Sequence, residues 1–253
     1  MVLDGFAVSR MDKDTVNKIA EHYKSSGDFD SVNTKLASRI ICPYCENRSV
    51  LEVGCASGEM TKDLVDVAAS VTVVEPSSRF SEGVQRRFGS KVRVLNGFME
   101  DIEEPLRYDV VVVASLLHHL ENPSAFLDAA RRLLNEHGVL FATVPNMTSL
   151  HRRLGVKAGA LRDVSDATET NVTFQQPGRF VKASLEDLFR RSGYEILESY
   201  AYMLKPFSNE QMSKLELGWP IIDALFEIGK EHPDLASHIF IRARRGDRRY
   251  PFA

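Results

Sequence analysis

The stretch Leu51–Met60, LEVGCASGEM, decides the fold class of this chain. An apolar run typical of a buried strand passes through Gly54 and Gly58 into a segment with the pattern of a helix. Glycines at such a turn let the backbone approach a ligand closely, and the first turn of the following helix has N–H groups without helical partners. The sequence therefore predicts a ligand-binding turn between a strand and a helix.

Apolar runs and amphipathic segments alternate on both sides of this turn, from about residue 49 to residue 244. Such alternation predicts βαβ units with right-handed crossovers, and therefore a sheet that is mostly parallel. We expect a doubly wound α/β fold with the most continuously apolar strand, 108–115, at its centre. Seven strands are predicted, at residues 50–53, 71–75, 91–97, 108–115, 137–145, 194–204 and 238–245.

Three segments interrupt the alternation. Residues 11–41 have the pattern of two short helices, and residues 208–230 have the pattern of one more helix. The segment after the fifth strand is too long for an ordinary connection and is predicted to form a lid over the substrate. The expected organisation is an N-terminal helical cap at 1–45 and a main domain at 46–253, with lid insertions at about 146–182 and 205–232.

The composition limits the classes of protein to which the chain can belong. Of its 253 residues, 43% are hydrophobic and 26% are charged, which is close to the average of globular proteins and enough to bury a core. No apolar run approaches the roughly 18 residues of a membrane span. The formal net charge of −3 argues against non-specific binding to nucleic acid. Three cysteines cannot all pair with one another, so we expect a protein of the reducing cytoplasm.

The glycine turn excludes two common phosphate-binding motifs. A dinucleotide fingerprint that starts at Gly54 would need glycines where Ala56 and Glu59 stand, and no Gly-Lys-Ser/Thr follows as in a P-loop. What remains is E-x-G-x-x-x-G, with Glu52 on the strand and a second acid, Glu75, at the end of the next strand. An acid at that place accepts hydrogen bonds from the hydroxyls of a ribose. The pattern therefore predicts a nucleoside ligand without a pyrophosphate.

Four segments stand out along residues 49–146. They are LEVGCASGEM at 51–60, VVEPS at 73–77, YDVVVVASLLHHLENP at 108–123 and LLNEHGVLFATVPN at 133–146. In this order and spacing they resemble the successive motifs of class I S-adenosylmethionine-dependent methyltransferases, most of all the small-molecule branch typified by the ubiquinone-pathway O-methyltransferases. The resemblance implies a Rossmann-like form of the doubly wound fold, S-adenosylmethionine as cofactor, and methyl transfer to an O or N nucleophile of a small molecule.

The resemblance also implies which residues hold the cofactor. The turn at 54–58 would line its methionine part, Glu75 would hold the ribose, and Met99 would contact the adenine. Phe98 is a departure, because the family often has Asp there, so the usual acid for the adenine amino group is missing. The residues expected to bind the cofactor are Glu52, Gly54, Cys55, Ala56, Gly58, Glu75, Pro76, Ser77, Met99, Glu100, Ser115 and Leu116.

Three residues are candidates for the chemistry. A general base is needed only when the acceptor atom is protonated near neutral pH. His119 matches the family's histidine in "HL" and is either this base or a group that holds the loop through a backbone hydrogen bond. Tyr23 belongs to the expected N-terminal cap and would contact the cofactor or only pack. Asn146, just after the fifth strand, would hold a polar substrate group or only form a turn.

Other polar residues near these motifs receive less weight. His118 is expected near the surface, as a neighbour of the cap. Arg179 in the predicted lid would pair with a carboxylate or be solvated, and the histidine that relatives often have in this segment is missing. Cys42 and Cys45 have C-x-x-C spacing, but no second pair or nearby histidine pair completes a zinc site, so no metal is expected.

The acceptor and the reaction stay open at this level. The residues after the fourth strand, Ser115 to His118, lack the Asn/Asp-Pro-Pro-aromatic tetrad of enzymes that methylate nucleic-acid bases, so a small molecule is expected. One alternative is a lyase on the same fold that cyclises S-adenosylmethionine to azetidine-2-carboxylate and methylthioadenosine. Another is a scaffold that binds the cofactor without catalysis. The chain is expected to be a monomer or a homodimer, without a membrane or nucleic-acid partner.

Overall fold

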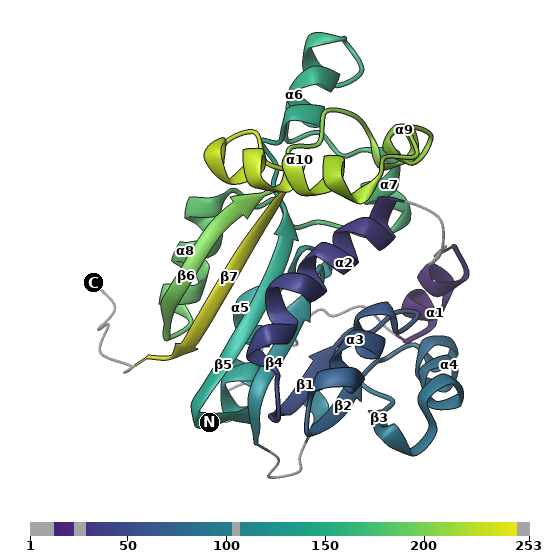
Figure 1. Ribbon diagram of the computed structural model, residues 1–253, viewed down its shortest axis with the longest axis vertical. Helices are drawn as coiled ribbons and strands as arrows, with labels where there is room; N and C mark the ends of the chain where they lie inside the picture. The colour runs from purple at the N-terminus through teal and green to yellow at the C-terminus, as the bar shows by residue number, and fades with distance from the viewer. Residues whose placement is uncertain (1–12, 23–28, 103–106, 247–253) are drawn as a thin grey trace, which may run out of the picture.

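One seven-stranded sheet organises the chain in a computed structural model that describes residues 13–22, 29–102 and 107–246. The strand order is β3-β2-β1-β4-β5-β7-β6 (Figure 1). Pairs among the first five strands are parallel, and β7 pairs antiparallel with both β5 and β6. The strands are β1 Ser49–Val53, β2 Ser70–Val74, β3 Val92–Leu95, β4 Tyr108–Ala114, β5 Leu134–Pro145, β6 Tyr194–Tyr202 and β7 His238–Arg245. The predicted doubly wound, mostly parallel α/β fold is confirmed.

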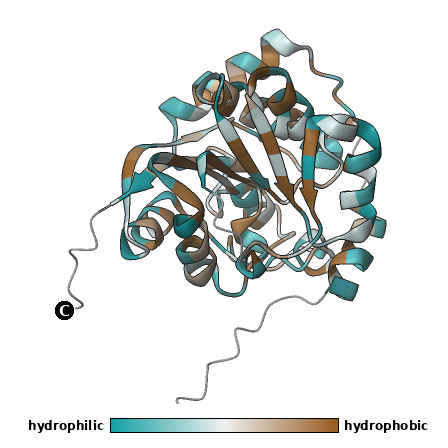
Figure 2. Ribbon diagram, turned by 90° about the horizontal axis from the view of Figure 1, so that it is seen from below, coloured by the Kyte–Doolittle hydropathy of each residue, from teal (hydrophilic) through white to brown (hydrophobic). Residues whose placement is uncertain are grey.

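Helices cover both faces of this sheet. Buried residues of α5 and α8 join the core on one face, and those of α2, α3, α4, α9 and α10 join the core on the other. Figure 2 shows strands with long hydrophobic stretches, surrounded by helices in which hydrophobic and hydrophilic residues alternate. The helices are α1 Lys13–His22, α2 Phe29–Ile41, α3 Glu59–Val67, α4 Ser78–Phe88, α5 Pro123–Leu133, α6 Leu150–Lys157, α7 Glu169–Thr173, α8 Lys182–Arg191, α9 Asn209–Ser213 and α10 Trp219–Glu231.

The central strand and the helix after it follow the sequence closely. Val110 to Val113 of β4 are completely buried, because both faces of this strand are covered by helices, and the strand lies in the middle of the sheet. The α5 helix begins at Pro123, and the Asn122 side chain accepts a hydrogen bond from the backbone N–H of Ala125 at 3.0 Å. Both predictions are confirmed.

The segment predicted as one helix at 208–230 is two helices instead. The Ser208 hydroxyl caps α9, and the backbone N–H of Ser208 bonds to Gln211, which completes a capping box. Gly218 caps α10, with Pro220 in its first turn. The two start signals ten residues apart explain the break. No helix in the described part of the chain is both long enough and apolar enough to span a membrane.

Candidate functional site

A large cavity opens at the carboxyl ends of the parallel strands. Its volume is about 1560 Å³, more than the roughly 300–1,000 Å³ of an ordinary ligand pocket. The wall comes from the segments after β1, β2, β4 and β5, with additions from α1, α2, α6 and residues 205–211. The strand order reverses between β1 and β4, and ligands of open α/β sheets bind at such a point. The cavity has room for two molecules side by side.

The glycine turn forms one end of the cavity in a conformation that requires glycine. Gly54 and Gly58 have φ angles of 76° and 80°, which side chains disfavour. A Cβ at Gly58 would also lie 3.0 Å from atoms of Val84 and Phe88. Ala56 between them has a φ of 46° and therefore carries local strain. The turn exposes backbone atoms to the cavity at its Gly54 to Ser57 portion.

Glu75 joins this turn to the end of β2. Its buried carboxylate accepts hydrogen bonds from the backbone N–H of Ser77 at 2.9 Å and of Ala56 at 3.3 Å, and the Cys55 thiol lies 3.8 Å away. Burial raises the pKa of Glu75 above its usual value, and these hydrogen bonds oppose that rise. The carboxylate lines the cavity with its position held from two sides.

Glu52 is a second acid in this wall and has a different environment. It is buried on β1 and accepts a hydrogen bond of 2.6 Å from the Thr61 hydroxyl of α3. Burial raises its pKa to about 8, so the carboxyl group is mostly protonated at neutral pH. Glu52 therefore offers the cavity a neutral carboxyl group.

Of the residues expected to hold the cofactor, all but Gly58 and Ser77 line the cavity. Gly58 packs against α4, and Ser77 is fully buried, where its hydroxyl caps α4 and donates to Asn17 Oδ1 at 2.9 Å. These two residues support the cavity wall without lining the cavity themselves. Phe98 and Glu100 both line the cavity where the expected adenine end lies, and Asp101 does not.

Asn17 on α1 is a residue that the sequence did not indicate. Its Oδ1 accepts hydrogen bonds from the Ser77 hydroxyl and from the backbone N–H of Ser78 at 3.1 Å, so α1 is fixed to the start of α4. Val16 and Ile19 of the same helix line the cavity. The helix α1 therefore contributes to the cavity wall, and Tyr23 lies outside the described residues.

The two histidines after β4 are both inside the wall, on a short 3₁₀ turn at Leu117–His119. His119 Nδ1 lies 2.9 Å from the Phe174 carbonyl, so Nδ1 carries the proton, and Nε2 lies 3.5 Å from the Gln176 amide nitrogen. Burial lowers the pKa of His119, which keeps the ring neutral at pH 7. The hydrogen bond from His119 to the Phe174 carbonyl is the backbone contact that the sequence analysis gave as one alternative. The Gln176 side chain lies next to Nε2.

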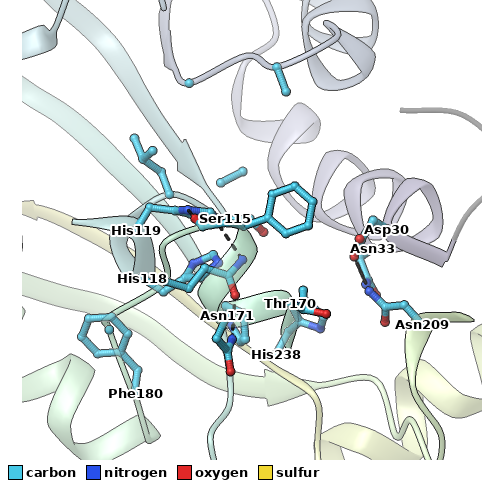
Figure 3. Close-up of a pocket in the computed structure, with 18 of the residues that line it drawn as sticks. Asp30, Asn33, Ser115, His118, His119, Thr170, Asn171, Phe180, Asn209 and His238 are labelled. Atoms are coloured by element: carbon cyan, nitrogen blue, oxygen red, sulfur yellow. Dashed lines mark hydrogen bonds between the residues drawn. The ribbon is translucent and has the colours of Figure 1, made fainter. Parts of the chain in front are cut away.

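The expectation that His118 lies near the surface is wrong. Its side chain is only 5% exposed, because the backbone of Gly178 packs directly over this turn and donates to the His118 carbonyl at 3.0 Å. Its Nδ1 has no hydrogen-bond partner among the described residues. Figure 3 shows His118 and His119 together on one side of the cavity, with Asp30, Asn33 and Asn209 opposite.

Asn146 is buried and fully engaged by its own loop. Its amide nitrogen donates to the carbonyls of Pro233 and Ala236, at 3.2 and 2.9 Å, and its Oδ1 accepts from the backbone N–H and the hydroxyl of Thr148. These bonds use both donors and the acceptor of the amide. The structure therefore gives Asn146 a role in holding the loop, and corrects the expectation that its amide is available to a substrate.

Residues 146–182, the predicted lid, contain α6 and α7, and many of them line the cavity. The two ends of this segment are joined by the Met147 N–H, which donates to the Phe180 carbonyl at 2.8 Å, and the segment meets the turn after β4 where the Gly178 N–H donates to the His118 carbonyl. Arg179 neither pairs with a carboxylate nor is solvated as expected, because it is partly buried and bonds to the carbonyls of Gln176, Gly178 and Ser165. Its guanidinium stabilises the lid backbone.

Comparison with known proteins identifies the family of this chain. The sequence model of one family, described as the methyltransferase domain, matches residues 15–199, which is most of the chain. The chain belongs to this family. The mitochondrial ubiquinone biosynthesis O-methyltransferase of Schizosaccharomyces pombe is 30% identical over 132 residues, which are 49% of this chain and 48% of that protein. The human protein of the same name is 26% identical over 171 residues, 63% of this chain and 44% of that one. The chain spans about half the length of these relatives.

Solved structures show the same methyltransferase fold at low sequence identity. The Burkholderia thailandensis 1,6-didemethyltoxoflavin-N1-methyltransferase, with S-adenosylhomocysteine bound, has a TM-score of 0.58 and 17% identity, over 86% of this chain and 80% of that one. The [4+2]-cyclase SpnF has a TM-score of 0.60 and 14% identity, over 92% of each chain. A methyltransferase-like fold thus also carries other chemistry, so the acceptor side of the cavity has to be read from its own residues.

The cavity wall also contains basic residues that the sequence analysis missed. Lys205 follows β6, His238 begins β7 and His151 lies on α6, and all three line the cavity. Lys205 and His238 lie beyond the match to the family model. No local motif connects the three positions, since they are separated by 54 and 33 residues in the chain.

The C-x-x-C pair of the methyltransferase lies away from these residues. Cys42 and Cys45 are free thiols at a 3₁₀ turn after α2, and neither lines the cavity. Burial raises the pKa of Cys42 to about 11 and of Cys45 to about 12. Both are thus protonated at neutral pH, whereas a redox or metal-binding thiol needs the thiolate.

Proposed function

We propose that this methyltransferase binds S-adenosylmethionine and transfers its methyl group to an oxygen or nitrogen atom of a small molecule. The observation that carries the proposal is the cavity of about 1560 Å³, whose one end has the glycine turn and Glu75, and whose other end has the histidine pair and the lid. The chain belongs to the methyltransferase-domain family, and its relatives are O-methyltransferases by name. They favour methyl transfer over the cyclising lyase.

The residues at the glycine end fit a nucleoside. The Glu75 carboxylate is held by the backbone N–H groups of Ser77 and Ala56 at the end of β2, where a carboxylate accepts hydrogen bonds from ribose hydroxyls. The strained backbone at Gly54 to Gly58 leaves room for a ligand without side chains in the way. Met99, Phe98 and Glu100 would lie against the adenine, with Ser115 and Leu116 facing the sulfonium.

When bound, the cofactor supplies a methyl group on a positively charged sulfur that is a good leaving group. The chain's own residues then need to align the acceptor and exclude water. The predicted lid would do the second of these, held against the turn after β4 by the hydrogen bond from Gly178 to His118. His119 has its proton on Nδ1, and its Nε2 lone pair would accept the proton of an acceptor hydroxyl that takes the place of the Gln176 amide.

The proposal extends to the partners of the protein, its compartment in the cell and its oligomeric state. A small-molecule acceptor fits the enclosed cavity, and the net charge of −3 gives no general attraction for nucleic acid. Three free cysteines, of which two are buried, suit the reducing cytoplasm. We place the protein there as a monomer or homodimer, with residues 1–45 as a cap on the cofactor side.

The test is calorimetric titration with S-adenosylhomocysteine of the wild-type protein, Glu75→Gln and Glu82→Gln. Loss of a hydrogen bond to a charged group costs about 1.5–3 kcal/mol, so Glu75→Gln should bind about ten- to a hundredfold more weakly. Glu82 lies on α4 with a side chain that is 68% exposed, and its substitution should leave the affinity unchanged. Absence of binding to the wild-type protein, or equal binding by Glu75→Gln, would contradict the proposal.

A further inference from the structure

One ammonium group is buried in the cavity wall without a carboxylate in contact. Lys205 is 5% exposed, and its Nζ donates to the Oδ1 of Asn209, a neutral amide. Among the described residues no acid lies within ion-pair distance of Lys205. The nearby Asp30 accepts a hydrogen bond from the Asn209 amide, and its charge raises the pKa of Lys205 by less than burial lowers it. Burying a charge without a partner is costly, so proteins seldom retain one unless it meets a ligand.

Three histidines share this part of the wall. His238 is buried beside Lys205, at the point where β7 pairs with the ends of β5 and β6, and its Nδ1 lies 2.9 Å from the Ser237 hydroxyl. His118 and His151 both have a buried Nδ1 without a hydrogen-bond partner among the described residues. Buried polar atoms are nearly always hydrogen-bonded, so two open ones in a cavity wall indicate a ligand that is hydrogen-bonded there.

The electrostatic environment of these histidines is positive. Besides burial, the positive charges of Lys205 and Arg152 lower the pKa of His151, and the charge of Arg179 lowers that of His118. Arg152 donates to the carbonyls of Val164 and Asp166, so its own hydrogen bonds also go to neutral groups. Lys205 and the three histidines come from four separate segments, and all four line one cavity.

Apolar side chains complete the same end of the cavity. Phe174 and Phe180 of the lid line the cavity next to the turn that carries His118 and His119. Met147 and Leu154, from the start and middle of the lid, also line the cavity. The ligand that suits this wall combines an apolar skeleton with a negative charge, because the charge is stabilised by Lys205 and the skeleton by the rings.

We propose that the acceptor of this enzyme is an organic acid, whose carboxylate binds Lys205 and accepts hydrogen bonds from His238 and His151 while its apolar part lies against the lid. The proposal rests on the proposed function and names the substrate class for the same site. His118, in the same part of the wall, would donate to the same acceptor. The negative charge of the acid thereby compensates the buried ammonium group.

The test uses benzoate and its neutral isostere benzamide as probes. Each is titrated calorimetrically into the wild-type protein, Lys205→Met and Lys214→Met, with and without saturating S-adenosylhomocysteine. Lys214 is the matched control, because it follows α9 and its side chain is 71% exposed. We expect the wild-type protein to bind benzoate at least about tenfold more tightly than benzamide. Lys205→Met should bind the two equally, and Lys214→Met should behave as wild type.

Equal affinity of the wild-type protein for benzoate and benzamide would overturn the proposal, and so would an unchanged preference in Lys205→Met. The titration with S-adenosylhomocysteine separates this outcome from failure of the proposed function. If all three proteins bind the nucleoside but none prefers benzoate, only the acceptor class is wrong. If none binds the nucleoside, the proposed function fails, and the titrations without it still report the preference for a carboxylate.

Discussion

Replacement of Lys205 by methionine should make the protein more stable at neutral pH. The side chain is almost fully buried, and burial lowers its pKa from 10.5 to about 8, so at pH 7 the folded protein holds an ammonium group where a neutral group is preferred. Methionine has a similar length and no charge, and it tolerates irregular surroundings. The substitution therefore removes the cost of the charge without leaving a large cavity.

The magnitude follows from the two pKa values. A difference of about 2.5 pKa units corresponds to about 3 kcal/mol, since one unit is worth about 1.4 kcal/mol. The variant also loses the hydrogen bond from Lys205 to Asn209, and this loss cancels about 1 kcal/mol of that gain. The free energy of unfolding at pH 7 should thus rise by about 2 kcal/mol.

The pH dependence gives this prediction a second signature. Because the pKa of Lys205 is lower in the folded than in the unfolded protein, the unfolded chain binds more protons between about pH 8 and pH 10.5. The wild-type protein therefore gains stability relative to Lys205→Met as the pH rises through this window. The advantage of the variant should shrink by about 2 kcal/mol between pH 7 and pH 9.5, and approach zero.

Urea denaturation followed by circular dichroism measures both quantities. Lys214→Met, at an exposed position, should change the free energy of unfolding by no more than about 0.5 kcal/mol at either pH. If Lys205→Met were less stable than wild type at pH 7, or if its advantage were the same at pH 9.5, the charge of Lys205 would not be an uncompensated cost. The reasoning that connects this residue to an anionic ligand would then lose its basis.

Three further expectations concern glycines, two of them in close contact with neighbouring backbone and one with open space around it. Gly229→Ala in α10 should lower the free energy of unfolding by about 3 kcal/mol, because its Cβ would collide with the Met203 backbone nitrogen. Gly83→Ala in α4, where there is open space around the glycine, should raise the free energy of unfolding by about 0.5–1 kcal/mol. If urea denaturation gave the same change for Gly83→Ala and Gly229→Ala, the packing argument would be refuted. Gly178→Ala would bring a Cβ to 2.7 Å from His118 Cα, so it should cost about 1–3 kcal/mol while S-adenosylhomocysteine binding, measured by calorimetry, stays unchanged. Wild-type stability of this variant would show that the lid does not press on the histidine turn.

Several features of the fold were predictable from short stretches of sequence. The run Val110–Val113 is apolar at every position, and only a strand covered on both faces accommodates such a run, so the centre of the sheet was visible. Gly54 and Gly58 mark positive φ angles, and Asn122 before Pro123 marks a helix start. Each of these signals depends on burial or on backbone conformation within a few residues.

Other features depended on contacts between distant segments. The burial of His118 results from Gly178, sixty residues later, and the bonds of Asn146 are made with residues near the start of β7. The insertion of β7 between β5 and β6 is likewise a matter of long-range pairing. Nothing in the local pattern around these residues distinguishes a surface position from a buried one.

The sequence by itself therefore determined the doubly wound fold, the glycine turn and the acid at the end of the second strand, because these are encoded in local periodicity and backbone preference. Only the tertiary structure decided which basic residues meet in the cavity wall. Lys205, His151, His238 and His118 lie on four elements, and it is the sheet order and the folding of the lid that bring them to one wall. A single chain's sequence records the identity of such residues, whereas their proximity is a property of the packed molecule.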